Sequence, residues 1–80
     1  MEFEYEQLAI AIVQLAVQDY AKALATLHGN SDDEDAKRVR LEVEGFFRSR
    51  WLTVLTTIPG HLLMEYGERL AKERMGTKSK

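Results

Sequence analysis

No glycine or proline occurs in the first 28 residues, and this uninterrupted stretch constrains the fold more than any other feature of the sequence. Alanine, leucine and glutamine dominate the stretch, and all three favour helix. Gly29 follows, and glycine commonly ends a helix. We predict a helix over residues 3–28 with one broad apolar face at the helical period. That face consists of Ala9, Ile12, Val13, Ala16, Val17, Tyr20, Ala23, Leu24 and Leu27.

This apolar face is wider than a single neighbouring helix usually covers. Leu8 and Leu15 extend it sideways, because they lie off the main face beside Asp19. This side of the helix is therefore a candidate contact surface, for example between two copies of the chain.

The polar segment after Gly29 indicates where a second helix begins. Ser31 and Glu34 have the spacing of a capping box, in which the two side chains satisfy first-turn amides reciprocally. Acidic residues surround this pair, and negative charge stabilises the N-terminus of a helix, where the helix dipole is positive. Because the connector is short, we predict that the second helix runs antiparallel to the first.

The second helix carries its apolar residues on one face, and the phase of this face holds from residue 36 to residue 54. Gly45 and Ser49 weaken the middle of the segment. A single long helix and a helix broken near Ser49 are therefore both open interpretations. The face consists of Ala36, Val39, Val43, Phe46, Phe47, Trp51 and Val54.

We predict a turn over residues 56–60, because β-branched residues are followed there by the only proline, Pro59, and by a glycine, Gly60. Pro59 suits the first turn of a further helix, with Thr57 as its cap. Gly67 inside that helix either permits close helix approach or leaves the helix marginal. The apolar face of this helix consists of Leu62, Leu63, Tyr66 and Leu70.

Together these elements predict an all-α fold, an antiparallel helical hairpin plus a C-terminal helix in a three- to four-helix bundle. We expect a single helical domain over residues 1–75 and a disordered basic tail over residues 76–80.

The chain has 80 residues, no cysteine and a formal net charge of −2. Without cysteine, neither disulfides nor Cys-based metal sites can form. The negative balance disfavours nucleic acid as a partner, since nucleic-acid binders usually carry a basic excess. The N-terminus is acidic, unlike a secretory signal. The apolar stretch from Leu8 to Val17 is too short to span a bilayer. We therefore expect no membrane partner and a location in the cytoplasm of a bacterial host.

The residue types needed for catalysis do not form a recognisable motif. Nucleophilic catalysis needs Ser or Cys beside a positioned base, and the only histidines, His28 and His61, lie at helix boundaries in unrelated segments. No glycine loop suited to phosphate is present. His61 and Glu65 have a spacing found in helical metal sites, but they form a single pair. We expect no enzymatic activity, no cofactor and no metal.

The string Phe46-Phe47-Arg48-Ser49-Arg50-Trp51 carries three large aromatic side chains and two arginines within six residues. In one interpretation the aromatic rings anchor the core and the arginines extend along them. In the other the segment is a binding hot spot, since Trp, Tyr and Arg dominate hot spots. Both interpretations are open. The candidate partner-binding residues of the whole chain are Arg38, Arg40, Arg48, Arg50, Trp51, Leu8 and Leu15.

Residues 46–51 also match the pattern Phe-Phe-Arg-Ser-x-Trp, and weaker matches lie at residues 10–13, 19–20, 23–24, 55–56 and 62–63. On the basis of these matches, the chain resembles over residues 5–72 a group of small helical proteins carried by phages, prophages and integrative elements of Firmicutes. That group has no established common activity. The chain departs from it at Arg50, where the group tends to have an acidic or small residue, and at residues 57–60, where the group usually has an acidic residue before its last helix.

The resemblance implies a mobile-element origin, and three functional hypotheses follow. The first is a phage-type accessory protein that binds a host or phage protein, in its sharpest form an inhibitor of host defence such as an anti-CRISPR protein. The second is a nucleic-acid-associated regulator or replication accessory that uses the four arginines. The third is a structural homodimer formed through Leu8 and Leu15.

Overall fold

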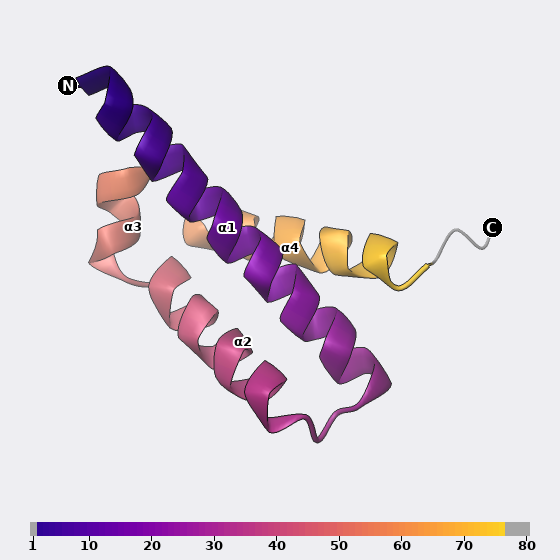
Figure 1. The fold of residues 1–80 in the computed structure, drawn as a ribbon. Coiled ribbons are helices and arrows are strands. Elements are labelled where there is room, and N and C mark those ends of the chain that lie inside the picture. Colours follow the sequence, from indigo (N-terminus) through magenta and orange to yellow (C-terminus); the bar gives the residue numbers. More distant parts are fainter. Residues whose placement is uncertain (1, 77–80) are drawn as a thin grey trace.

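The computed structural model describes the backbone of residues 2–76 and the side chains of residues 6–76. The described chain is all-helical, with α1 at Glu2–Gly29, α2 at Glu34–Phe47, α3 at Arg50–Leu55 and α4 at Gly60–Arg74. Figure 1 shows α2 running antiparallel beside α1, while α4 passes behind α1 and crosses it. The predicted hairpin with a C-terminal helix is confirmed. The predicted tail lies outside the described residues, apart from Gly76.

The core lies where α1 meets the other three helices. Its larger side chains come from one face of α1, from two positions of α2 and from single positions of α3 and α4. The phenol ring of Tyr20 meets the ring of Phe47 edge-on at a centroid distance of 6.0 Å. The predicted apolar face of the first helix supplies most of its α1 part. The buried cluster consists of Val13, Val17, Tyr20, Val43, Phe47, Leu52 and Leu63.

The N-terminus of α2 is capped by Asp33, whose Oδ1 accepts a 2.9 Å hydrogen bond from the amide of Ala36. The predicted Ser31–Glu34 capping box is therefore wrong. The helix begins at Glu34, so Ser31 lies in the turn before the cap, where its side chain is exposed.

The long second segment breaks after Phe47, which decides between the two interpretations of its length. The amide of Arg48 still donates to the carbonyls of Glu44 and Gly45, but Ser49 adopts an extended conformation with ψ near 164°. The hydroxyl of Ser49 donates a 2.7 Å hydrogen bond to the carbonyl of Phe46. A new helix, α3, then starts at Arg50 in a different direction (Figure 1).

The break overturns part of the predicted apolar face. In a continuous helix Trp51 would lie one turn after Phe47 and share its buried side. Because α3 starts afresh, Leu52 enters the core instead, while Trp51 and Val54 are exposed. The interpretation in which Trp51 anchors the core is therefore wrong. Phe47 is buried and Phe46 is partly buried against the core, as that interpretation predicts for these two residues.

Helix α4 begins after Pro59, which occupies the N-cap position without a side-chain hydrogen bond. The prediction that Thr57 caps this helix is wrong, since Thr56 orders the turn instead by accepting the Ile58 amide at its hydroxyl. Gly60 lies directly against the backbone carbonyl of Phe47, where a Cβ atom would collide. This contact holds the start of α4 against the end of α2.

Helix α4 packs on α1 through its smallest residues. Gly67 is buried, and a Cβ atom placed on it would lie 2.7 Å from Cδ2 of Tyr20. The prediction that Gly67 permits close approach of two helices is thus confirmed. Consequently Leu62 and Tyr66, which the apolar pattern places in the core, are exposed instead.

Candidate protein-binding surface

Many of the large apolar side chains in the described part of this domain are exposed to solvent. Ten are exposed among the described residues, against seven larger than alanine that are buried, and no large side chain is fully buried. Exposed apolar side chains mark a site of interaction when they lie together, so their grouping on the helices is what matters. The exposed set consists of Leu8, Ile10, Ile12, Leu15, Leu41, Trp51, Val54, Ile58, Leu62 and Tyr66.

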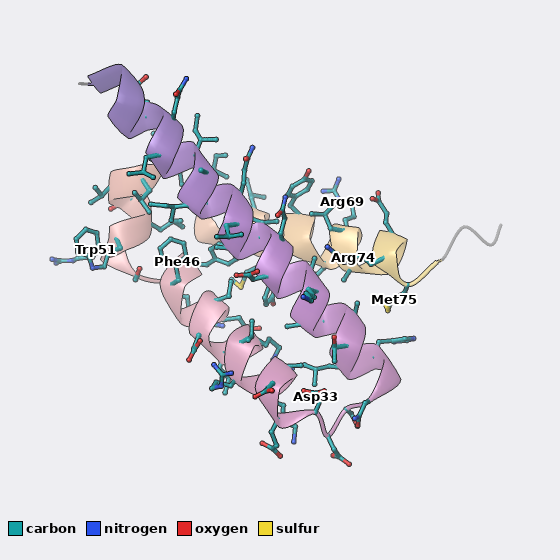
Figure 2. The ribbon with its side chains drawn as sticks, in the orientation of Figure 1. Asp33, Phe46, Trp51, Arg69, Arg74 and Met75 are labelled. Atoms are coloured by element: carbon teal, nitrogen blue, oxygen red, sulfur yellow. The ribbon has the colours of Figure 1, made fainter. Side chains whose placement is uncertain are left out.

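Trp51 is the most exposed of these residues, at 68%. Figure 2 shows its ring projecting from α3 away from the body of the domain, whereas Phe46 points back toward α1. Arg50 and Val54 are also exposed. Val54 follows Trp51 by three residues and Arg50 by four, so it neighbours both on the outer side of α3. We refer to Arg50, Trp51 and Val54 as the Trp51 surface.

The core fixes the position of the Trp51 surface. Leu52, the neighbour of Trp51, is only 3% exposed and anchors α3 in the core. At the start of α3 the hydroxyl of Thr53 donates a 2.7 Å hydrogen bond to the carbonyl of Arg50. An indole held outward on an anchored helix loses little conformational freedom when a partner covers it.

The four candidate arginines do not form one edge. Arg38 lies beside Asp35 and Glu42, at 3.4 and 3.6 Å, on the exposed side of α2. Arg40 and Arg48 lie on another side, where the carboxylate of Glu44 is 4.0 Å from Nε of Arg40 and 3.9 Å from Nη2 of Arg48.

Within the described part of the chain, Arg50 is the one candidate arginine without an ion pair. Three of the four candidate arginines thus have carboxylates beside them. Arg50, which adjoins Trp51 in the sequence, has no ion pair with any described side chain.

A second apolar surface lies on α1. Leu8, Ile12 and Leu15 are spaced by four and three residues, so they share one side of the helix, and all three are exposed. We call these three residues the α1 stripe. The structure adds Ile12, which the sequence pattern assigns to the core, to the predicted pair of Leu8 and Leu15.

A shallow groove of about 390 Å³ runs between α1 and α4 beside the α3–α4 turn. Its lining includes no Asp, Glu, His, Lys or Arg, so the phenol of Tyr66 is its only titratable group. The groove can accept apolar groups, but general acid–base chemistry near neutral pH would need a group of suitable pKa that the lining lacks. The lining consists of Ile10, Val13, Gln14, Val17, Gln18, Leu55, Thr56, Ile58, Leu63, Tyr66 and Leu70.

The strongest electrostatic perturbation lies in the core, at Tyr20. Burial raises the pKa of its phenol to about 12, aided by the hydrogen bond to Glu44 and by the negative charge of that carboxylate. A phenol with a raised pKa is a poor base at neutral pH, so this group serves structure. Among the described residues no group of three metal-ligating side chains comes together.

One segment of the described chain, Glu6–Gly29 within α1, has the length and apolar composition of a membrane span. The central helix of a soluble bundle passes the same test, and 33% of the most apolar part of this segment is buried inside the bundle. The packing is compatible with a soluble protein.

Comparison with protein families, with curated proteins and with solved structures finds no match to this chain.

Proposed function

We propose that this chain is a phage-type accessory protein that acts by binding another protein through the Trp51 surface. The observation that carries the proposal is the exposure of its only tryptophan on a helix that the core holds in place. Tryptophan and arginine are the residues most enriched among binding hot spots. Here both occur on one side of α3.

The ion pairs along α2 favour a protein over a nucleic acid as the partner. Nucleic-acid affinity comes mainly from cations that neutralise phosphates. Arg38, Arg40 and Arg48 already lie beside carboxylates, which would have to be displaced. The net charge of −2 adds general repulsion from a polyanion.

The mobile-element resemblance of residues 5–72 makes a host protein the expected partner. The sharpest form of the proposal is inhibition of a host defence system, such as CRISPR immunity, by occupying a surface that the defence protein needs. Binding alone is enough for such a role, which is compatible with a small domain that offers apolar anchors.

A capture experiment from a bacterial host lysate tests the proposal. Tagged wild-type protein should retain a host protein that Trp51→Ala releases and Leu41→Ala keeps. Leu41 is a suitable control because it is exposed to a similar degree, 60%, but lies on α2. If Trp51→Ala retains the same proteins in the same amounts, binding does not depend on the Trp51 surface and the proposal fails.

The defence-inhibitor form has its own test. Expression of the wild-type chain in a host with active CRISPR immunity should raise the plaque count of a targeted phage, and Trp51→Ala should abolish this effect. Unchanged plaque counts with the wild-type chain would contradict inhibition of that system.

A further inference from the structure

The α1 stripe lies on a segment of α1 that carries no charge. From Gln7 to Gln18 the helix contains no charged residue on any side, which is more than three full turns. The inner side of this segment contributes Val13 and Val17 to the core. The outer side presents Leu8, Ile12 and Leu15 to solvent, with the small Ala11 between them.

The isolated chain also has a thin core. Five of its twelve buried apolar residues are alanines, Ala9, Ala21, Ala23, Ala36 and Ala71. Domains of this size bury a small share of their surface, so extra apolar burial through oligomerisation adds substantially to their stability when disulfides are lacking. The chain has no cysteine. A permanent cover over the α1 stripe would supply the missing apolar burial.

We propose that a second copy of this chain is that cover, with the α1 stripe of one copy packed against the α1 stripe of the other. A twofold interface places the same patch on both sides, so a charge close to the twofold axis would face its own copy. The stretch from Gln7 to Gln18 avoids this repulsion, whereas α2 exposes charged residues along its outer side, among them Arg38 and Glu42.

The spacing of the stripe also suits a helix pair. Leu8, Ile12 and Leu15 repeat at intervals of four and three residues, which is the pattern of an apolar seam between two helices. A stable interface takes about 800 Å² from each partner, about one seventh of the 5853 Å² that this chain exposes. Because the Trp51 surface is on α3, the dimer offers two copies of it to other proteins.

Light scattering over a range of protein concentrations tests the dimer. The wild-type chain should have twice its monomer mass of 9.2 kDa, and Leu15→Glu should shift the mass to that of the monomer. Leu41→Glu is the matched control, since Leu41 and Leu15 are 60% and 58% exposed. It should stay dimeric. A wild-type monomer at the highest concentration would overturn the proposal, as would a Leu15→Glu protein that remains dimeric.

A second pair of variants does not depend on how well Leu15→Glu folds. Because the chain has no cysteine, Leu15→Cys and Leu41→Cys each introduce a single thiol. A short thiol-specific crosslinker should join two Leu15→Cys chains and leave Leu41→Cys chains single. The reverse pattern would place the interface on α2 and overturn the proposal.

Tryptophan emission identifies the surface that dimerisation covers. On dilution from dimer to monomer the emission of Trp51 should stay constant, because the proposed interface leaves Trp51 in water. A spectral shift that follows the dimer mass would put the interface at α3 and contradict the proposal. Wild-type monomer that sediments with phosphatidylcholine vesicles would assign the α1 stripe to lipid, and would likewise overturn it.

Discussion

The phenol of Tyr20 on α1 donates a 2.8 Å hydrogen bond to Oε2 of Glu44 on α2. This bond joins the two arms of the hairpin at the point where the Tyr20 ring also meets Phe47 and the backbone of Gly67. Glu44 in turn lies between Arg40 and Arg48. One aromatic residue therefore fixes the distances of both α2 and α4 from α1.

Loss of this hydrogen bond should destabilise the domain. Tyr20→Phe keeps the ring and its packing but removes the donor to a carboxylate, so we expect a loss of about 1–2 kcal/mol in the free energy of unfolding. Urea unfolding at neutral pH measures the loss. An unchanged midpoint would contradict the role given to the bond.

Stability should also fall at alkaline pH. The folded-state pKa of Tyr20 is raised from 10.0 to about 12, so the folded chain holds its phenolic proton more tightly than the unfolded chain does. The stabilisation is fully present below pH 10 and is lost as the pH rises to about 12. Urea unfolding between pH 8 and pH 12 should show this fall in the stability of the wild-type chain. The stability of Tyr20→Phe should fall less over the same range, because it has no phenol at position 20 to titrate. Identical slopes for the two proteins would contradict the raised pKa.

Because α4 approaches α1 closely at Gly67, replacing two helical glycines by alanine should have opposite effects on stability. Gly67→Ala should destabilise the domain by about 1 kcal/mol, because overpacking against the pinned Tyr20 ring costs about 1–3 kcal/mol and outweighs the gain in helix propensity. Gly45→Ala should stabilise by up to about 1 kcal/mol, since nothing lies within 4 Å of its added Cβ atom. Thermal unfolding of both variants is the measurement, and a stabilised Gly67→Ala would refute the close approach.

The two candidate caps of α2 can be separated by mutation. Asp33→Ala should cost about 1 kcal/mol, because it removes the acceptor of the Ala36 amide. Ser31→Ala should change stability by less than about 0.5 kcal/mol, as expected for an exposed residue outside the cap. Denaturant midpoints of the two variants decide the matter, and a larger effect of Ser31→Ala would restore the capping box.

The hairpin was predictable because its determinants are local. Helical periodicity without glycine or proline defines α1 up to Gly29, and a short polar connector returns the chain antiparallel. The exposure of Trp51 was not predictable in the same way. The apolar phase runs unbroken through Ser49, and only the extended backbone at Ser49 turns α3 so that Leu52 replaces Trp51 in the core.

The contact face of α4 was predictable only in part: Leu63 is buried and Gly67 permits close approach as the sequence predicts, but Leu62 and Tyr66 are exposed. An apolar pattern gives most weight to large residues, so Leu62 and Tyr66 were assigned to the core. The structure instead buries Gly67 and Ala71, because close helix approach needs small residues at the crossing point. Leu62 and Tyr66 then face outward as part of the exposed apolar surface. A pattern of residue types does not reveal which large apolar residues of a helix face outward in this way.

Truncation to alanine should have very different effects on the stability of the isolated domain at Trp51 and at its neighbour Leu52. Leu52→Ala should cost about 2–5 kcal/mol, since it removes a buried anchor. Trp51→Ala should change the free energy of unfolding by no more than about 0.5 kcal/mol, because the ring is mostly in water. Chemical denaturation compares the two variants. A large loss in Trp51→Ala would mean that the ring packs in the core.

The central claim is that Trp51 is an anchor for a partner protein. The most direct test is the affinity of that partner for the Trp51→Ala chain compared with the wild-type chain. The protein captured by the wild-type chain is purified, and its dissociation constant is measured by calorimetry with the wild-type chain and with Trp51→Ala. A hot-spot residue contributes at least about 2 kcal/mol on truncation, so we predict that Trp51→Ala binds about 30-fold more weakly or worse. An affinity within twofold of the wild-type value, with the variant fully folded, would contradict the claim.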